Sequence, residues 1–453
     1  MDDITKASTI EEKGRTFYYY NASIKGGTTS EHLAKLLPEI LNGFTWPKSM
    51  RWGAHEIKWV RPLHSIIAIF GGKIVPFKFG HIESGNTTQG HRFLDSSKLQ
   101  VASFKEYKEG LAKRKAIIDP EERKKIIWEA AKKAAGNFEL KDDERLLSEV
   151  ANLVEYPVVL VGEFDKSFLD VPQECLISTM KANQKYFPLF EGGKLTNKFI
   201  ITSNMIADDG GKKIIHGNER VIKARLSDAK FFWEQDQKTK LDDLLPKLES
   251  VVFHAKVGTL RAKVSRVAAL SKYIANIIGA DAAKAERAAL LCKADLVTGM
   301  VGEFAELQGI MGCYYANAQG EAPEVANAIK EHYQPLGQDD NVPTTKTSVA
   351  VALADKIDSL VQLWEAGEKP TGSRDPLALR RAALGVIRII LENNLKINLQ
   401  ALITQASKNG EAGMPEIFEF FIFCIYNYII KKRLHKRLQP RKFLHCRCKI
   451  LRA

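Results

Sequence analysis

The chain has 453 residues, of which 45% are hydrophobic and 27% are charged, and its formal net charge is +13. This composition excludes a disordered, fibrous or collagen-like chain, and the length predicts two to four domains. The six cysteines are too few and too scattered for a disulfide framework, and the acidic opening Met1-Asp2-Asp3 is unlike a secretory signal. We therefore expect a protein of the reducing cytoplasm.

The positive charge is concentrated at the end of the chain. Residues 431–453 contain ten Lys or Arg and no Asp or Glu, and subtracting these ten charges leaves +3 for the rest. The net charge alone therefore does not indicate a nucleic-acid partner, and that partner has to be argued from motifs.

The first part of the chain mixes helix and strand signals. The aromatic run from Thr16 to Ile24 predicts a strand, preceded by a short helix or coil. Thr28 and Glu31 have the spacing of a capping box and open an amphipathic helix, which Pro38 should kink or divide. Further expected elements are a hairpin turning at two glycines over 60–79, a basic helical segment over 105–135, and buried strands at 158–161 and 199–203.

From about Leu241 the strand signals nearly vanish, and apolar residues recur every three or four positions. The expected helices are 255–278, 281–300, 322–333, 347–365 and 376–393. Breaks are expected at Gly279, 309–312, 335–343 and 367–372. We therefore predict an α+β region over residues 1–240, followed by an all-α region over residues 241–410.

Residues 411–453 have a different character. An apolar, aromatic run from Phe420 to Ile430 precedes the basic end, and eleven residues are too few to span a bilayer, which needs about 20. Two interpretations remain open. Apolar and basic residues together are typical of a membrane-surface anchor, whereas the abrupt loss of acidic residues indicates an aberrant tail.

The common catalytic motifs are absent. The sequence contains no phosphate loop, no dinucleotide fingerprint, no zinc-protease motif and no nucleophile elbow. The helical region instead resembles HD-type phosphohydrolases, with His254 as the first His, Cys292-Lys293 in place of the His-Asp doublet, and Asp355 as the last Asp. A lysine ammonium has no lone pair for a metal and adds positive charge. We therefore expect an HD-like domain that binds no metal.

Two groups of polar residues are candidates for contact with RNA. Lys181, Gln184 and Lys185 adjoin aromatic residues, as in single-stranded nucleic-acid platforms. Arg380 and Arg381 have the planar guanidinium groups that match phosphate oxygens. The alternative, which the residues leave open, is that these side chains are intramolecular partners of Asp228, Asp375 or helix ends, or lie at a partly buried strand edge.

Several blocks together resemble one family, the β subunit of the bacterial two-subunit glycyl-tRNA synthetase. They occur in order over about residues 15–410. The blocks are Met50-Arg51-Trp52-Gly53, Val60-Arg61-Pro62-Leu63-His64, Gly90-His91-Arg92-Phe93, Met180-Lys181-Ala182-Asn183-Gln184-Lys185-Tyr186-Phe187, Gly217-Asn218-Glu219-Arg220-Val221, residues 224–232, Gly258-Thr259-Leu260-Arg261 and residues 375–385.

The resemblance implies a glycine–tRNA ligase of α2β2 composition in the cytoplasm. In that family the α subunit carries the catalytic core with ATP and Mg, and the β subunit binds and positions tRNA(Gly). This chain would then hold no catalytic residue and no cofactor, and it would need no membrane. Residues 181, 184, 185, 380 and 381 would be tRNA-binding candidates.

The resemblance also predicts missing parts. The family has about a hundred further residues at the start and a helical anticodon-binding domain at the end, so the chain resembles a β subunit truncated at both ends, with 411–453 in place of the start of that domain. Two other functions stay open: a stand-alone RNA-binding fragment without ligase activity, and a residual HD-type phosphohydrolase.

Overall fold

A computed structural model describes residues 8–19, 26–337, 339–371, 374–407 and 414–435. Contacts divide the chain into two compact units. The first comprises 1–134, 142–160 and 202–214, and the second comprises 135–141, 161–201 and 215–453. This division does not follow residue 240, and the boundary expected there stays a prediction for proteolysis.

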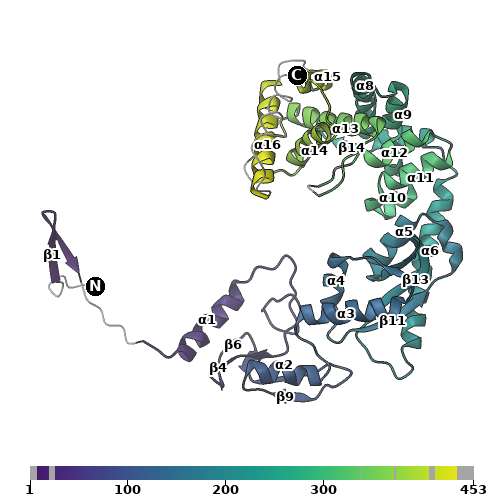
Figure 1. Ribbon diagram of the computed structural model, residues 1–453. Helices are drawn as coiled ribbons and strands as arrows, with labels where there is room; N and C mark the ends of the chain where they lie inside the picture. The colour runs from purple at the N-terminus through teal and green to yellow at the C-terminus, as the bar shows by residue number, and fades with distance from the viewer. Residues whose placement is uncertain (1–7, 20–25, 338, 372–373, 408–413, 436–453) are drawn as a thin grey trace. The chain divides into compact units, whose positions relative to one another are not determined.

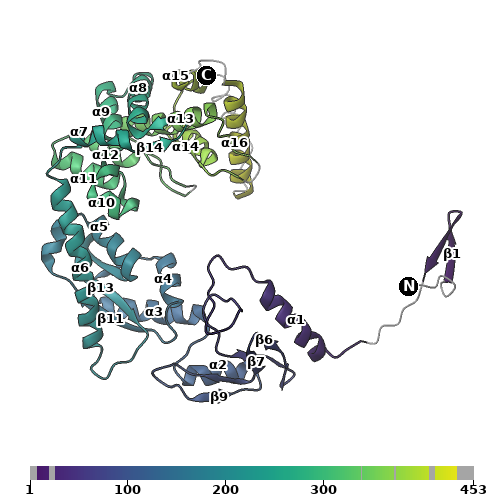
Figure 2. The same cartoon turned by 180° about the vertical axis from the view of Figure 1, so that it is seen from behind.

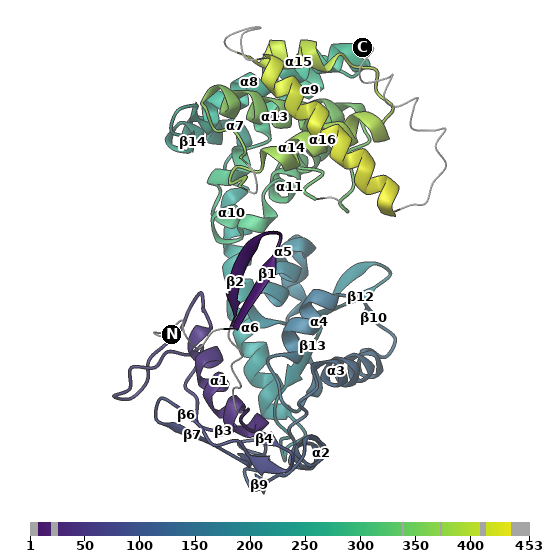
Figure 3. The ribbon, with the colours of Figure 1, turned by 90° about the vertical axis from the view of Figure 1, so that its left-hand side faces the viewer.

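The chain begins with a β-hairpin, seen at the labels β1 and β2 in Figure 3. β1 (Ser8–Glu12) pairs antiparallel with β2 (Arg15–Tyr19). The turn residues Lys13 and Gly14 have φ of 51° and 73°, as a two-residue hairpin turn requires. The expected short helix or coil is therefore wrong for residues 8–12, which pair as a strand. The end of the predicted strand, residues 20–24, lies outside the described residues.

Helix α1 (Thr29–Gly43) confirms the predicted capping box. The Glu31 amide donates to Thr28 Oγ1 at 3.3 Å, and the Thr28 amide donates to Glu31 Oε2 at 2.9 Å. Pro38 does not divide the helix, so that part of the prediction is wrong. Proline removes only one backbone donor, and the helix continues beyond it, where Asn42 Nδ2 donates to the Pro38 carbonyl at 2.8 Å.

Short strands and three helices complete the first part of the chain. The predicted glycine hairpin is confirmed as β4 (Ile69–Phe70) and β5 (Lys73–Ile74). The segment 105–135 is largely helical, as predicted, and is divided into two helices, because Lys115 has φ 58° and Pro120 opens the second. The other elements are β3 (Ile66–Ile67), β6 (Lys78–Phe79), β7 (Ile82–Gly85), β8 (Thr87–Gln89), β9 (Lys98–Gln100), α2 (Phe104–Lys113), α3 (Pro120–Ala135) and α4 (Glu144–Ala151).

A four-stranded sheet has the order β10-β12-β13-β11. Both strands predicted from the sequence are present and are neighbours in this sheet, but only the one at 199–203 is largely buried, because residues 158–161 are only half-buried. Leu189, Phe199 and Ile200 are fully buried in it. The strands are β10 (Glu139–Leu140), β11 (Val158–Glu163), β12 (Phe187–Glu191) and β13 (Lys194–Ser203); the associated helices are α5 (Gln173–Ser178) and α6 (Lys212–Asp236).

The helical region is built around α13 (Lys346–Glu365), which is buried along most of its length. Helices α8, α9, α12 and α14 pack on it, as Figures 1 and 2 show from opposite sides. The five predicted helices and the break at Gly279 are present. The helices of the region are α7 (Leu241–Leu244), α8 (Leu260–Ile278), α9 (Ala282–Leu291), α10 (Gly299–Glu303), α11 (Ile310–Ala318), α12 (Pro323–Glu331), α14 (Leu379–Glu392), α15 (Leu399–Ala406) and α16 (Met414–His435).

Three local differences from the prediction lie in the helical region. Residues 252–259 form a small hairpin, β14 (Val252–His254) with β15 (Gly258–Thr259), so α8 begins later than expected. Helix α9 ends at Leu291 rather than 300 because Asp295 turns inward and accepts hydrogen bonds from the amides of Gly309 and Gly312. Helix α11 lies where only a break was expected.

Helix α16 covers part of the segment expected to be aberrant. Ile417, Phe421 and Cys424 recur at helical spacing and are buried, and the helix contacts α14 and α15. Figure 3 shows α16 crossing in front of α14. Residues 408–413 and 436–453 lie outside the described residues. Of the helices that the structure describes, none is long and apolar enough to cross a membrane.

Deleting residues 431–453 is expected to leave the melting temperature unchanged, because the buried residues of α16 named above precede the cut. The deletion removes ten Lys or Arg residues, so non-specific binding to duplex DNA should fall at least about tenfold and lose most of its salt dependence. Melting curves and DNA titrations at two salt concentrations measure both effects. A large fall in melting temperature would show that the basic end is structural.

Candidate nucleic-acid interface and buried charge cluster

The run from Met180 to Phe187 forms a turn anchored by its apolar members. A π-helical turn, η3 (Thr179–Asn183), leads into β12. Met180, Tyr186 and Phe187 are buried. The Tyr186 amide donates to the Met180 carbonyl at 3.0 Å, and its ring stacks on Phe199 at 4.7 Å between centroids. These contacts hold the intervening polar residues on a defined turn.

Tyr186 also links this turn to α6. Its hydroxyl donates to Asn218 Oδ1 at 2.6 Å and lies 3.5 Å from Gln184 Oε1. Burial raises the pKa of Tyr186 to about 12, so the hydroxyl stays protonated and remains a donor at neutral pH. Two of the blocks that carried the family resemblance are therefore neighbours in the structure.

The structure brings Lys181, Gln184 and Lys185 together on this turn, each with an intermediate degree of burial. Lys185 has φ 61°, in the left-handed region that residues with side chains seldom adopt. Such conformations cluster at functional sites, and π-turns frequently do as well. Both observations are compatible with a binding role for the turn.

Arg380 and Arg381 lie on a separate element, the first turn of α14. The Asp375 carboxylate accepts hydrogen bonds from the amides of Leu379 and Arg380, each at 2.9 Å. It caps the helix because Ala378, at the N-cap position with φ 57°, has no side chain that could do so. Arg381 is exposed and Arg380 is half-buried. Asp375 therefore caps the first turn of the helix that carries both arginines.

The four positions expected from the HD pattern have different environments. Lys293 and Asp355 come together, with the lysine Nζ 3.5 Å from Asp355 Oδ1. Cys292 is buried and donates to the Ala289 carbonyl, and burial raises the pKa of its thiol to about 12. His254 Nε2 lies 3.7 Å from Glu368 Oε1.

Sequence reasoning missed Lys263, which is the closest cation to Asp355. Its Nζ lies 3.1 Å from Asp355 Oδ1 and 3.2 Å from Asp358 Oδ2. The sequence signal that could have identified Lys263 is its position in the apolar stripe of α8, beside the buried Leu260 and Val264. A lysine in such a stripe needs a buried carboxylate partner.

His332 and Lys356 complete this buried charge cluster, which we define as Lys263, Lys293, His332, Asp355, Lys356 and Asp358. Lys293 Nζ lies 2.7 Å from His332 Nε2, and Lys356 Nζ donates to the carbonyls of His332 and Tyr333 at 3.1 Å. Burial, reinforced by Lys293, holds the pKa of His332 well below its usual range. The neutral ring therefore accepts from Lys293 and donates its Nδ1–H to the Ile329 carbonyl at 2.7 Å.

Burial and the neighbouring charges shift the pKa values of the acidic and basic groups in the cluster. Burial favours the neutral form of Asp355, but the ammonium groups of Lys263 and Lys293 dominate and hold the pKa of its carboxyl well below the usual range. Burial lowers the pKa of Lys356 to about 8, against the opposing effect of Asp355. Among the described residues, no group of three or more His, Cys, Asp or Glu is arranged to hold a metal ion.

Comparisons with known proteins agree with the motifs. The profile of the family described as "Glycyl-tRNA synthetase beta subunit" matches residues 2–442, beyond the limit of about 410 expected from the motifs. Proteins named glycine–tRNA ligase beta subunit from Rhodospirillum centenum and Phenylobacterium zucineum are each 46% identical, over 93% and 92% of this chain. One from Ruegeria sp. is 45% identical over 89%. The chain spans 64%, 62% and 60% of the lengths of these relatives.

Proposed function

Because the chain belongs to the glycyl-tRNA synthetase beta subunit family, we propose that it takes part in joining glycine to tRNA(Gly) as the tRNA-binding subunit. Its partner is the α subunit, which supplies the catalytic core with ATP and Mg, and the complex acts in the cytoplasm. The observation that carries this proposal is the match to the family over residues 2–442. The absence of common nucleotide-binding motifs from the sequence is compatible with this division of labour.

Within this function we assign the helical region to an HD-like domain without metal chemistry. The Asp355 carboxylate, at the last-Asp position, has two ammonium groups within 3.5 Å. A divalent cation placed beside this carboxylate would face both positive charges. The domain then contributes a folded scaffold, and hydrolysis of a phosphate ester is not part of its role.

Co-expression with a glycyl-tRNA synthetase α subunit tests the proposal. We expect the two chains to purify together and the mixture to glycylate tRNA(Gly) faster than the α subunit alone. The chain alone should catalyse no glycine-dependent ATP–pyrophosphate exchange. Binding of tRNA without association with the α subunit would favour a stand-alone RNA-binding fragment, and metal-dependent release of phosphate by the isolated chain would favour a phosphohydrolase.

Replacement of Lys185 with glycine tests its contact with tRNA. Glycine adopts φ 61° without strain, so the variant removes the ammonium group while it keeps the backbone of the turn. We expect tRNA affinity to fall several-fold and the salt slope to decrease by about one, with no loss of melting temperature. The exposed Lys194 on β13, replaced with alanine, is the control. A lower melting temperature with an unchanged salt slope would assign Lys185 a structural role.

A further inference from the structure

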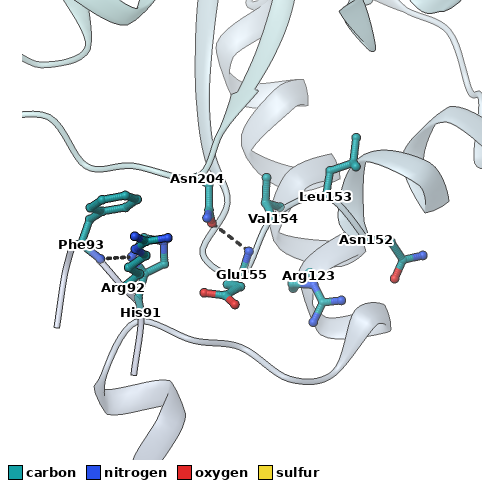
Figure 4. A pocket seen from close by; sticks show the side chains of 9 residues that line it. All are labelled: His91, Arg92, Phe93, Arg123, Asn152, Leu153, Val154, Glu155 and Asn204. Carbon is teal, nitrogen blue, oxygen red and sulfur yellow. Dashed lines mark hydrogen bonds between the residues drawn. The ribbon is translucent and has the colours of Figure 1, made fainter. Parts of the chain in front are cut away.

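A pocket of about 420 Å³ lies within the first compact unit, with its lining drawn in Figure 4. Arg92 and Phe93 form one side, and Arg123, Asn152 and Leu153 form the other. The volume is within the range of small-ligand sites. All of its lining residues lie outside the turn and helix that carry the tRNA-binding candidates discussed above.

The loop that carries Arg92 and Phe93 is anchored by His91, the buried residue that precedes them. His91 is only 1% exposed, and its Nδ1 accepts hydrogen bonds from the amides of Phe93 at 3.3 Å and Leu94 at 3.2 Å. Its own amide donates to the Arg114 carbonyl at 2.9 Å. A side chain at Gly90 would place Cβ 2.3 Å from the Asp95 carbonyl oxygen, so only glycine fits there.

This rigid loop exposes an aromatic ring. Phe93 is 71% exposed, and the Arg92 guanidinium carbon lies 5.5 Å from its ring centroid. Burial of a phenylalanine ring would stabilise the fold, and an exposed ring gives no such stabilisation. The contacts of His91 nevertheless hold this loop in the conformation that exposes Phe93. An exposed aromatic ring beside an arginine is a platform on which a nucleobase can stack.

The facing wall offers hydrogen-bonding groups. Arg123 Nε donates to the Ala151 carbonyl at 2.7 Å, and Nη1 donates to the Ile117 carbonyl at 2.5 Å. These bonds fix the guanidinium group. Its Nη2 has no hydrogen bond in the described part of the chain. Asn204 Oδ1 accepts from the amides of Glu155 and Tyr156, at 2.8 and 2.9 Å, so its amino group remains available.

The other lining groups narrow the ligand class. The exposed Leu153 adds an apolar surface, and the Glu155 carboxylate can accept a hydrogen bond from an amino group on a base. Arg92 and Arg123 both supply cations for phosphate. A ligand that satisfies the platform, the carboxylate and the cations together has an aromatic base with an amino group and an adjoining phosphate.

We propose that this pocket binds one unpaired nucleotide, with the base stacked on Phe93 and the phosphate held by Arg92 and Arg123. The proposal rests on the proposed function in that an RNA strand is the expected source of the nucleotide. A free nucleoside monophosphate has the same chemistry and is distinguished by experiment.

The test uses the full chain and a fluorescent single-stranded RNA octamer of A and C. Phe93→Ala should weaken binding at least about tenfold, because loss of one stacking partner has effects of that size, whereas Phe93→Trp should preserve affinity. Arg92→Ala should reduce the salt slope by about one. The matched control is Phe104→Ala, since Phe104 on α2 is 73% exposed and should leave the affinity unchanged.

The outcomes separate this proposal from its alternatives. Unchanged RNA affinity in Phe93→Ala, or equal losses in Phe93→Ala and Phe104→Ala, would overturn it. Reduced association of Phe93→Ala with the α subunit at unchanged RNA affinity would overturn it in favour of a protein-docking loop. If AMP displaces the octamer from the wild type and not from Phe93→Ala, the site binds the free nucleotide; if AMP does not compete, it binds RNA. A wild type that binds the octamer through Phe93 but neither tRNA(Gly) nor an α subunit would refute only the proposed function.

Discussion

Replacing Asp355 with alanine is expected to lower the free energy of unfolding by about 3–5 kcal/mol, because it leaves a buried positive charge without its partner. Lys263 and Lys293 approach this carboxylate to 3.1 and 3.5 Å. Lys263 keeps Asp358 as a second partner, whereas Lys293 is left facing the neutral ring of His332. Urea unfolding followed by circular dichroism measures the loss.

The double variant Lys293→Met/Asp355→Ala separates the effect of charge from the effect of lost packing. Removing both members of a buried pair often restores much of the stability lost when one is removed, so this variant should be more stable than Asp355→Ala. Glu324→Ala, which removes a carboxylate from the solvent-exposed pair with Lys284, is the surface control and should leave the midpoint essentially unchanged. Equal midpoints for Asp355→Ala and wild type would show that the cluster is not coupled to folding.

Replacing Asp295 with asparagine is expected to have the opposite effect at neutral pH and to raise the free energy of unfolding by about 1–3 kcal/mol. Burial raises the pKa of Asp295 to about 6, against the hydrogen bonds that the amides of Gly309 and Gly312 donate to it. Asparagine keeps an oxygen that can accept these hydrogen bonds and carries no charge. Asp295 Oδ1 has no hydrogen-bond partner in the described residues, so part of the gain is offset by the new amino group.

The pH dependence of the stability difference between Asp295→Asn and the wild type shows whether titration of Asp295 causes it. The folded-state pKa of Asp295 is raised above the unfolded value near 4, so the stabilising effect of protonation is present below pH 4 and is lost as the pH rises through 6. The difference between the variant and the wild type should therefore be small at pH 4, increase up to about pH 6 and remain constant above it. A constant difference across this range would exclude titration of Asp295 as its origin.

Local signals predicted the elements better than the contacts among them. The capping box at Thr28 and the apolar periodicity of α13 are encoded within a few residues of sequence, and both are confirmed. The pairing of Lys263 with Asp355 joins residues 92 positions apart, and no local pattern encodes it. The break after Leu291 likewise depends on Asp295 reaching the amides of Gly309 and Gly312.

The pocket beside Phe93 also depends on contacts between distant parts of the chain, which the sequence did not predict. The block from Gly90 to Phe93 was recognised as part of a family pattern, but its role in a pocket depends on Arg123, Asn152 and Asn204, which come much later in the chain. Basic residues beside aromatic ones were recognised around Lys185 from the sequence, whereas the turn and its left-handed backbone could be seen only in the structure. Direct contact of either site with RNA remains a prediction.

The positive charges beside Asp355 belong covalently to the chain. A metal ion at such a position can be removed by a chelator or exchanged for another ion, whereas the ammonium groups of Lys263 and Lys293 are made with the protein during translation. The positive partners of this carboxylate are therefore present in every newly made chain and need no supply of metal from the cell. We therefore expect the helical core to assemble equally well in metal-poor and metal-rich conditions.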